Sequence, residues 1–561
     1  MKLTEQREKV RMGIGIENFR EMRESGNYYV DKTRLIAEYL EAGDKVTLLM
    51  RPRRFGKTLN MSMLAEFFDI TKDAADIFAG TEIMGTKWRV EMNQYPVISL
   101  SFANARGDSG EFLLKLLSSE IRKEYMRYEF LWENEKIPGN MRKALSAIYE
   151  SLWNRNKSDG FGYLSESLTE LCAALELYYG KKVRVFIDEY DTPFIQAMTG
   201  GFYGEVRAVL STVLGSLLKG NASLGSAYLT GIQRVAKENL FSGINNLAVC
   251  TVNSPEYADC FGFTEKETKE LLEACGLELN ERVRGMYDGY RFGEYHIYNP
   301  WSVIYYAKRK RLEPFWVNTS ENSLIRSAMK ELEEEFRPGY EELIQKCEYG
   351  TDVKMDSSYY EIRDVETLWG LLLSSGMVTA GKIQEDGKCI LRVPNQEVMR
   401  AFRELTSLYL GIREGNMSQM FLCLEEGRIE AFADGYRRVL RSLPSYHDLK
   451  EENSYHMMML GMCTFLSRDY EVKSNRESGK GRSDITLKAR RKDYPNIIME
   501  FKYTKDEKKD LKELAEEALS QITDKEYTAE MAGEVLCIGL GHRGKDVEVK
   551  YRDFCQNSLN N

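Results

Sequence analysis

The residues VTLLMRPRRFGKTL, at positions 46–59, decide the fold of the first half of the chain. The apolar run Val46–Met50 predicts a strand, and a glycine, a lysine and a threonine follow at 56–58, where a helix would begin. A glycine there lets the backbone approach phosphates, and the helix N-terminus offers them unpaired N–H groups. The lysine can reach the β- and γ-phosphates, and the threonine hydroxyl can hold Mg²⁺. The stretch therefore predicts a nucleoside triphosphate site formed by Arg54, Phe55, Gly56, Lys57 and Thr58.

The match to the full pattern G-x-x-x-x-G-K-[ST] is incomplete, because Arg51 occupies the first glycine position. A second strand supports the interpretation: residues 182–190, KVRVFIDEY, end in Asp188 and Glu189. An acid at the end of a neighbouring parallel strand completes a Mg²⁺ shell, and a second carboxylate positions the attacking water. We assign Asp188 to the first role and Glu189 to the second. An Asp-Glu pair that only caps the next helix is the alternative, and the upstream loop favours the nucleotide site over it.

A third strand candidate, Ser226–Gly231, ends in a polar residue and is followed by an arginine. Thr230 could sense the γ-phosphate, and Arg234 could stabilise charge that develops during hydrolysis. Arg234 could equally cap a helix or form a structural ion pair, and the sequence does not choose.

Three arginines, Arg51, Arg53 and Arg54, surround the loop. They could add positive charge for the triphosphate or for an acidic partner. They could instead anchor the loop to neighbouring carboxylates, which is the favoured interpretation for Arg51 and Arg53.

The composition is that of a globular protein of several domains. A length of 561 residues predicts two to four domains, and 43% hydrophobic and 29% charged residues are ordinary values. No apolar run approaches the ~20 residues of a membrane helix, and residues 1–15 lack the apolar core of a signal peptide. Ten cysteines without a Cys-x-x-Cys pair favour reduced thiols and a cytoplasmic location. A net charge of −9 argues against a protein that coats nucleic acid, although it does not exclude a local basic groove.

The order of predicted elements is that of an α/β protein. Strand candidates at 46–50, 95–102, 183–187 and 226–231 alternate with long helical patterns such as 110–128 and 163–179, which predicts a mostly parallel sheet. The pattern of residues 255–350 predicts mostly helix, and that of residues 364–393 predicts a helix followed by a hairpin. That piece is either a small winged helix or a plain packing unit. A separate α/β segment spans about 450–545. We expect domains at 1–255, 256–395 and 396–561.

A second acidic cluster lies near the C-terminus. Side chains alternate along a strand, so Glu500 and Lys502 share one face of the strand 497–503, and Asp484 lies on its partner strand. Two carboxylates can hold Mg²⁺ or Mn²⁺, and the lysine can orient a hydroxide for attack on a phosphodiester. The alternative is three solvated ion partners. An apolar run before Glu500 favours the metal site, because a buried strand that ends in charge is costly without a ligand.

Three further features surround this cluster. Glu452 and His456 lie one helical turn apart and could add a metal ligand. Gln521 and Tyr527 lie at the end of a predicted helix, 513–522, that would cover the site. Basic residues are in local excess, as expected for a phosphate backbone, although such charges often form only a solvated face: Lys473, Arg476, Lys480, Arg482, Lys488, Arg490, Arg491 and Lys492.

The chain resembles bacterial proteins with an N-terminal AAA-ATPase-like domain and a C-terminal PD-(D/E)XK nuclease superfamily domain. The matching stretches are YYVDKT at 28–33, RPRRFGKT at 51–58, IDEYD at 187–191, NLFSGINNL at 239–247, YDGYRF at 287–292, YNPW at 298–301, YH at 455–456, GRSDI at 481–485 and EFK at 500–502. The loop without its first glycine is similar to this family's usual version.

The resemblance implies a P-loop NTPase sheet with a helical lid, and ATP at Lys57 and Thr58 with Asp188 on Mg²⁺. It also implies a restriction-endonuclease-like domain in which Asp484, Glu500 and Lys502 form the signature triad, preceded by Glu452. Gln521 and Tyr527 look like the glutamine-tyrosine element of exonuclease-type members.

These features together predict an ATPase coupled to a metal-dependent nuclease that acts on DNA. The first alternative is a nucleotide-dependent switch or scaffold whose nuclease-like domain only binds nucleic acid or protein. The second is a ring-forming homo-oligomer that remodels a substrate and needs an arginine supplied in trans, for which Arg234 is the candidate.

Overall fold

The computed structural model describes residues 10–154, 161–233, 247–316, 328–329, 331–355, 364–381, 383–384, 387–399, 401–402, 414–442, 452–463, 466, 469–478, 481–491, 494–528, 531 and 533–555. The chain divides into two compact units. The first comprises residues 1–316 and 351–390, and the second comprises 317–350 and 391–561. The expected domain limits at 255/256 and 395/396 stay predictions.

The first unit is built on a parallel sheet of five strands in the order β2-β3-β4-β1-β5. The strands are β1 (Val46–Met50), β2 (Val97–Ser101), β3 (Val183–Asp188), β4 (Leu224–Gly231) and β5 (Leu247–Cys250). The expected parallel α/β arrangement is confirmed, and β5 is an additional strand at the edge. Because all strands run the same way, the carboxyl ends of β1, β3 and β4 meet at one edge, where polar side chains can converge.

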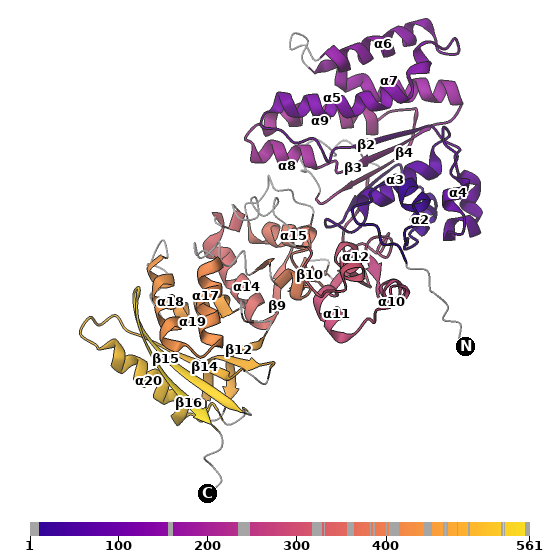
Figure 1. Ribbon diagram of the computed structural model, residues 1–561. Helices are drawn as coiled ribbons and strands as arrows, with labels where there is room; N and C mark the ends of the chain where they lie inside the picture. Colours follow the sequence, from indigo (N-terminus) through magenta and orange to yellow (C-terminus); the bar gives the residue numbers. More distant parts are fainter. Residues whose placement is uncertain are drawn as a thin grey trace, which may run out of the picture. The chain divides into compact units, whose positions relative to one another are not determined.

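Helices cover both faces of this sheet (Figure 1). One face carries α5 (Gly110–Arg127), α7 (Gly162–Tyr179) and α9 (Tyr203–Leu218), and their leucines pack on alternate residues of β1 and β3. The other face carries α2 (Arg34–Ala42) and α3 (Lys57–Phe68), packed through aromatic rings such as Tyr39 and Phe68. The remaining elements before β4 are α1 (Phe19–Glu24), α4 (Ala75–Phe78), η1 (Glu82–Gly85), η2 (Lys87–Glu91), η3 (Glu129–Trp132), α6 (Gly139–Asn154) and α8 (Thr192–Thr199).

A smaller helical part follows the sheet. It contains α10 (Glu265–Ala274), α11 (Glu281–Tyr287) and α12 (Pro300–Arg309), with a short sheet in the order β6-β8-β7. The aromatic-rich stretches of the sequence form these strands, β6 (Phe263–Thr264), β7 (Tyr290–Phe292) and β8 (Tyr295–Tyr298). Thr264 and Glu267 form a reciprocal capping box that starts α10. The expected helical lid segment is therefore present and has its own apolar core.

The expected helix and hairpin within 364–393 are also present. They are α15 (Val365–Ser375), β10 (Thr379–Ala380) and β11 (Lys388–Arg392). Main-chain hydrogen bonds join Gly381 to Ile390 and Gln384 to Lys388 across the hairpin. The winged-helix interpretation of this piece stays a prediction.

The second unit contains a mixed sheet in the order β12-β13-β14-β15-β16. Its strands are β12 (Tyr470–Ser478), β13 (Gly481–Ala489), β14 (Asn496–Tyr503), β15 (Glu534–Arg543) and β16 (Asp546–Cys555). Only the pair β14–β15 is parallel in this sheet, as the described residues form it, and α20 (Leu511–Asp524) is the crossover between the two. Such a crossover must pass over one face of the sheet. The separate α/β segment expected at the C-terminal end is confirmed.

The two faces of the second sheet carry different helices (Figure 1). One face packs on α17 (Glu414–Glu425), α18 (Ile429–Ser442) and α19 (Glu452–Cys463), and α20 covers the other. This unit also contains α14 (Glu333–Lys346), and β9 (Glu348–Asp352) spans the change of unit. Among the helices of the described residues, none has the length and apolar character needed to cross a membrane.

Candidate nucleotide and metal sites

The loop between β1 and α3 has the geometry of a phosphate-binding turn. Gly56 precedes α3 with φ of 87°, a value that L side chains rarely adopt. Phe55 is fully buried against Tyr290 and Phe292, with ring centroids 4.9 and 5.0 Å away, and its carbonyl accepts a hydrogen bond from Gly262. The loop is therefore held by the lid segment, and the first N–H groups of α3 stay available to an anion.

Lys57 lies over its own loop. Its side chain is 6% exposed, and Nζ donates to the carbonyls of Arg51 and Pro52, both at 2.9 Å. Lys57 also lines the cavity described below. Carbonyl oxygens are weaker partners for an ammonium than phosphate oxygens are, so a bound triphosphate would compete for this side chain.

Arg51 anchors the loop, as favoured from the sequence, but its partners are carbonyls rather than carboxylates. The guanidinium is fully buried and donates to the carbonyls of Thr251 and Glu256 at 2.5 and 3.2 Å. It also lies 5.1 Å from the ring centre of Phe292. Burial lowers the pKa of Arg51. The arginine at the first glycine position thus ties the loop to the segment after β5, and it is not directed at phosphate.

Arg54 connects the loop to the segment around α12. It has φ of 68°, and its guanidinium donates to the carbonyl of Phe315 at 3.0 Å and lies 4.6 Å from the ring centre of Trp301. Arg54 and Arg53 both line the cavity. The triphosphate role expected for Arg54 stays a prediction.

Asp188 ends β3 beside the loop. Its carboxylate is 3% exposed, and Oδ1 accepts a hydrogen bond from the Thr230 hydroxyl at 2.5 Å. Burial raises the pKa of Asp188, while the hydroxyls of Thr230 and Thr58 act in the opposite direction. Oδ2 is buried and lacks a hydrogen bond of good geometry within the described residues. A buried carboxylate oxygen that lacks a well-formed hydrogen bond, beside the hydroxyl of Thr58, fits a hard divalent cation.

The residues after Asp188 shape the same edge. Glu189 has φ of 50°, accepts from the Thr192 hydroxyl at 2.9 Å and lines the cavity. Asp191 accepts from the main-chain N–H groups of Ile232 and Gln233 at 2.8 and 3.1 Å, which fixes the end of β4. Burial raises the pKa of Asp191 to about 6. No sequence pattern gave Asp191 a role, although it lies three residues after Asp188. Arg234 lies outside the described residues, and its catalytic role stays a prediction.

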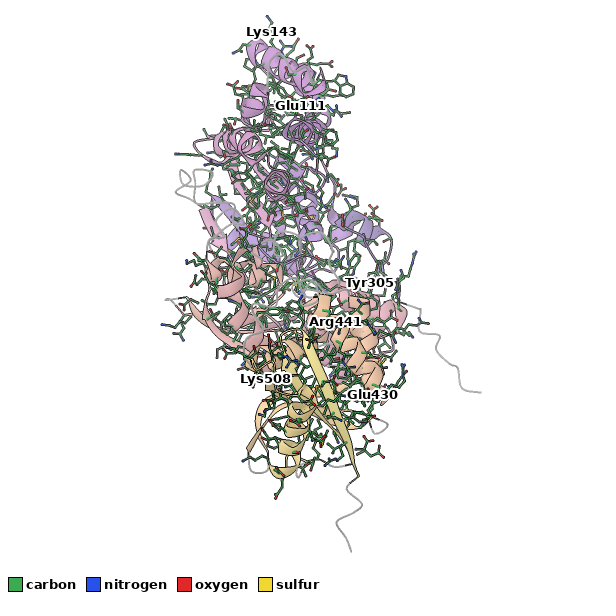
Figure 2. The ribbon with its side chains drawn as sticks, turned by 90° about the vertical axis from the view of Figure 1, so that its left-hand side faces the viewer. Glu111, Lys143, Tyr305, Glu430, Arg441 and Lys508 are labelled. Atoms are coloured by element: carbon green, nitrogen blue, oxygen red, sulfur yellow. The ribbon has the colours of Figure 1, made fainter. Side chains whose placement is uncertain are left out.

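A cavity of about 290 Å³ lies over the loop. Five cationic and two anionic side chains line it: Lys32, Arg53, Arg54, Lys57 and Arg106 against Glu17 and Glu189. Lys32 is already paired with Glu267 at 2.7 Å, and the other four cationic side chains still outnumber the two carboxylates. Its remaining wall includes the aromatic residues Tyr28, Trp301 and Tyr305. Tyr305 belongs to α12 and is labelled in Figure 2. A cationic end and an aromatic wall suit a ligand with phosphates and a flat ring.

The acidic residues of the second unit also come together. The Asp484 main-chain N–H donates to Glu500 Oε2 at 3.2 Å, and the Phe501 N–H donates to Asp484 Oδ2 at 2.9 Å. Gln521 donates to the other oxygen of Glu500. Burial raises the pKa of Asp484, and the charge of Lys502 partly offsets this effect. The two carboxylates and the ammonium thus form one cluster across β13 and β14.

This cluster lies on the face that α20 covers. Ile498 packs with Leu519 and Ile522 of α20, whereas Met499 and Phe501 belong to the core on the other face. Because Glu500 and Lys502 alternate with Met499 and Phe501, they share the face of Ile498. Helix α20 packs closely on β15 because β15 has glycines where the two meet. A Cβ at Gly539 would lie 2.3 Å from the Ala515 carbonyl oxygen, so a larger residue would push the helix away. Gln521 reaches the cluster as expected, and Tyr527 is buried in the small core beside it.

His456 supports the cluster from the opposite face. Its Nε2 donates to the Asp484 carbonyl at 3.0 Å, and its ring lies 5.9 Å from that of Phe501. His456 therefore holds the β13 main chain. Glu452 begins α19, but its side chain lies outside the described part of the chain, so its role as a metal ligand stays a prediction.

The comparisons with known proteins place a family on each unit. Residues 13–241 match the family model of a predicted AAA-ATPase, and residues 450–551 match that of the PD-(D/E)XK nuclease superfamily. The chain carries an AAA-ATPase-like domain and a PD-(D/E)XK nuclease superfamily domain. An uncharacterized protein in the vnfD 5′ region of Azotobacter chroococcum mcd 1 is 29% identical over 401 residues, which cover 70% of this chain and 69% of the relative.

The two matches include both acidic clusters. The loop, Asp188 and Thr230 fall within the AAA-ATPase-like domain, and Asp484, Glu500, Lys502 and Gln521 fall within the nuclease superfamily domain. The α/β fold expected for each is confirmed. Families of these kinds typically use ATP and a divalent metal ion, and a nuclease superfamily domain implies nucleic acid as the partner. Much of the expected basic surface, including Lys473, Arg476, Lys480, Arg482 and Lys492, lies outside the residues whose side chains are described.

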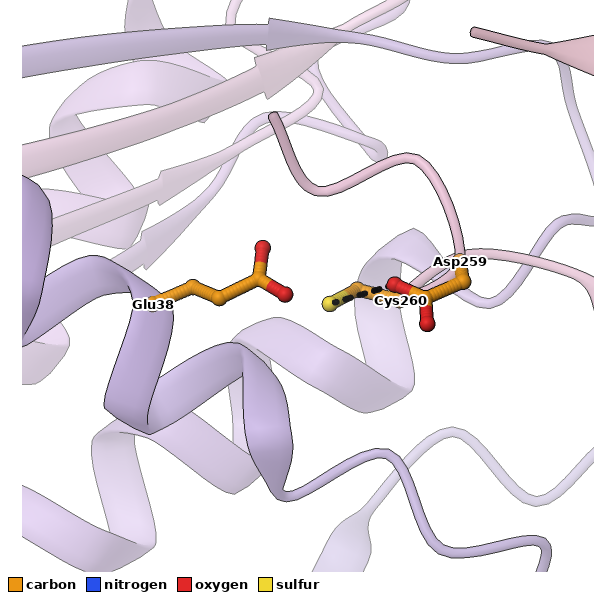
Figure 3. Close-up of side chains that lie close together, drawn as sticks. All are labelled: Glu38, Asp259 and Cys260. Carbon is orange, nitrogen blue, oxygen red and sulfur yellow. Dashed lines mark hydrogen bonds between the residues drawn. The ribbon is translucent and has the colours of Figure 1, made fainter. Parts of the chain in front are cut away.

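A third acidic group lies in the first unit and was not found from the sequence. Ligand atoms of Glu38, Asp259 and Cys260 lie within 4.8 Å of one another (Figure 3). Arg34 already pairs with both carboxylates, at 3.1 Å to Glu38 and 3.4 Å to Asp259. The Tyr257 N–H also donates to Glu38. We therefore interpret this group as an ion-pair cluster that joins α2 to the segment before β6.

Proposed function

We propose that the protein binds ATP with Mg²⁺ in the AAA-ATPase-like domain, hydrolyses it, and thereby controls a Mg²⁺- or Mn²⁺-dependent nuclease that acts on DNA. The observation that carries the proposal is the buried Oδ2 of Asp188, which lacks a well-formed hydrogen bond beside Thr58 at the edge of a cationic cavity. Such an oxygen is costly unless a cation completes its shell. The ten cysteines without a Cys-x-x-Cys pair favour a cytoplasmic location.

In this proposal each residue at the nucleotide site has one task. Lys57 leaves its loop carbonyls and contacts the β- and γ-phosphates, and Thr58 and Asp188 hold Mg²⁺. Glu189 orients the attacking water, and Thr230 keeps Asp188 in place through the hydrogen bond to Oδ1. The metal would neutralise charge that develops on the transferred phosphoryl group.

At the nuclease site, Asp484 and Glu500 would hold the metal ion, which supplies charge stabilisation for the pentavalent phosphorus. Lys502 lies on the same face as Glu500 and would orient a hydroxide. The oxygen of the hydroxide bonds to phosphorus, the bond from phosphorus to the leaving sugar oxygen breaks, and that oxygen takes a proton from water. Gln521 holds Glu500 in position from α20.

The test is a cleavage assay on labelled single- and double-stranded DNA and RNA, with Mg²⁺ or Mn²⁺ and with or without ATP. The wild-type protein should cleave DNA, and Glu500→Gln should lose cleavage by a factor of at least about 10³, because a metal-binding charge is worth several kcal/mol. Glu534→Gln, at the exposed start of β15, is the matched control and should cleave normally. A wild-type protein that cleaves none of these substrates would contradict the proposal.

One observation favours a second candidate, a nucleotide-dependent switch or scaffold that only binds nucleic acid or protein. Main-chain N–H groups and Gln521 already satisfy oxygens of Asp484 and Glu500, so the cluster is stable as it stands. Calorimetric titration with Mn²⁺ separates the two: binding to the wild type that weakens strongly in Asp484→Asn supports the nuclease, and no binding supports the scaffold. Sizing with and without ATP tests the third candidate, a ring-forming homo-oligomer.

A further inference from the structure

The segment after β2 is firmly held beside the proposed catalytic carboxylates. Ser101, at the end of β2, is in register with Asp188 in β3, and the Phe102 N–H donates to the Asp188 carbonyl at 2.9 Å. The chain then turns, with the Ala105 N–H donating to the Phe102 carbonyl at 3.0 Å. Ala105 is fully buried. Arg106 therefore begins from a fixed position at the carboxyl edge of the sheet.

The residue after the arginine holds the turn from the other side. A Cβ at Gly107 would lie 2.6 Å from the ring of Phe112 and 3.4 Å from the Leu113 nitrogen, so this glycine packs closely on the start of α5. Ser109 caps the same helix by accepting from the Phe112 N–H. The backbone on both sides of Arg106 is thus ordered by packing, which limits how far its side chain can move.

Arg106 itself is exposed and lines the cavity together with Lys57, Thr58 and Glu189. Within the described residues it makes one hydrogen bond, from Nε to the Ala103 carbonyl at 3.1 Å. This bond sets the direction of the side chain and leaves both terminal nitrogens of the guanidinium without a described protein partner. Arg51 and Arg54, by contrast, use their guanidinium groups on carbonyls.

We propose that Arg106 contacts the γ-phosphate and is the arginine that completes the ATPase site from within the same chain. The inference rests on the proposed ATPase function and names a residue for it. During hydrolysis the oxygen of water bonds to the γ-phosphorus, and the bond from that phosphorus to the bridging oxygen breaks. The electron pair stays on ADP, and the proton of water ends on the released phosphate. Arg106 donates to the γ-phosphate oxygens as their charge shifts toward the bridge.

Two consequences follow. A catalytic arginine in the same chain makes hydrolysis a property of the single chain, so the rate per chain should not depend on protein concentration. A γ-phosphate contact also separates ATP from ADP, because ADP lacks the group that Arg106 touches. Loss of Arg106 should therefore lower the affinity for ATP and leave the affinity for ADP unchanged, whereas loss of Lys57 should lower both affinities.

The experiment measures single-turnover ATP hydrolysis, and ATP and ADP affinities, for the full chain and for Arg106→Ala, Arg106→Lys and Lys57→Ala. Arg106→Ala should lower the hydrolysis rate by about 10³-fold or more, the effect typical of a catalytic arginine. Arg106→Lys should recover part of that loss, because a lysine keeps the charge without the two-pronged geometry. Arg89→Ala, at an exposed position of η2 away from the cavity, is the matched control and should hydrolyse ATP normally.

If Arg106→Ala hydrolyses ATP at the wild-type rate while Lys57→Ala does not bind ATP, the proposed role of Arg106 is overturned and the proposed ATPase function still holds. A rate per chain that rises with protein concentration would also overturn it, because the arginine would then come from a neighbour. If the wild type binds no ATP, or Lys57→Ala binds ATP as well as the wild type, the proposed ATPase function itself fails.

Discussion

The two acidic clusters satisfy their carboxylates in opposite ways. In the AAA-ATPase-like domain, Asp188 has one oxygen on Thr230 and one buried oxygen without a well-formed bond. In the nuclease superfamily domain, Phe501 and Gln521 donate to Asp484 and Glu500, and the Asp484 N–H bonds to Glu500 as well. The first cluster therefore keeps a carboxylate oxygen that a cation could bind, whereas the second is held together by the protein and would have to share its oxygens with a metal ion.

The difference lies in how the two sheets are built. The strands around Asp188 are all parallel, so their ends converge on a loop and a helix start that leave N–H groups free. Asp484 and Glu500 lie just beyond the last register pair of the antiparallel strands β13 and β14, Ile485 with Met499, and there the main-chain N–H groups of Asp484 and Phe501 donate to carboxylate oxygens. Substitutions in the two clusters test this contrast.

The sharpest test compares Asp188→Asn with Asp484→Asn. Asp188→Asn should lower Mg²⁺-dependent ATP hydrolysis by about 10³-fold, because the metal loses a charged ligand. It should also stabilise the protein without nucleotide, because it removes a buried carboxylate that lacks a full set of partners. Asp484→Asn should not stabilise the protein, since its oxygen already accepts from Phe501. Hydrolysis rates and urea denaturation measure both effects, and equal changes in stability would remove the contrast.

The close packing of α20 on β15 offers a way to break one domain alone. A Cβ at Gly539 would lie 2.3 Å from the Ala515 carbonyl oxygen and 2.5 Å from the Leu519 nitrogen, so Gly539→Ala must displace the helix that carries Gln521. We expect a loss of about 3 kcal/mol in unfolding free energy and loss of cleavage, with ATP binding retained. Gly215→Ala in α9, where a Cβ would meet nothing within 4 Å, is the control and should be neutral or slightly stabilising. Unchanged cleavage by Gly539→Ala would show that α20 is not needed at the site.

Asp191 gives the nucleotide-free AAA-ATPase-like domain a characteristic pH dependence. Its pKa rises from an ordinary 3.8 to about 6 on burial, so the unfolded chain loses this proton at lower pH than the folded chain. Stability therefore falls as the pH rises from about 4 to about 6, by about 3 kcal/mol for this group.

Asp191→Asn tests that dependence directly, because an amide oxygen can still accept from Ile232 and Gln233. In urea denaturation at several pH values, the free energy of unfolding of the variant should increase relative to that of the wild type as the pH rises. A difference that stays constant across this range would contradict the raised pKa.

The smallest expected effect concerns the residue that orients Glu500. Gln521→Leu removes the hydrogen bond to Glu500 while keeping the size of the side chain on α20. Mn²⁺ affinity should fall about 10-fold, as is usual when a group that orients a metal ligand is lost. Calorimetric titration checks this, and Thr523→Val on the same helix is the matched control. An unchanged affinity would mean that the main-chain bond from Asp484 suffices to hold Glu500.

Several parts of the structure could be read from the sequence because they depend on local chemistry. The strand at 46–50, the loop glycine and the helix after it follow from short-range rules, and the same holds for the alternation that places Glu500 and Lys502 on one face. The helices expected at 110–128 and 163–179 are present as α5 and α7. In each case the residues that determine the element are neighbours in sequence.

What the sequence alone determined is therefore the pair of domains, the order of their elements and the residue types at each acidic strand end. Tertiary structure decided which groups each of these side chains contacts. Three examples depend on segments that are distant in sequence. Arg51 bonds to carbonyls near Thr251 rather than to carboxylates, Asp191 holds the end of β4, and Arg106 faces the cavity. Burial of a charge and the direction of a hydrogen bond are set by what packs against a residue, and no local pattern specifies that.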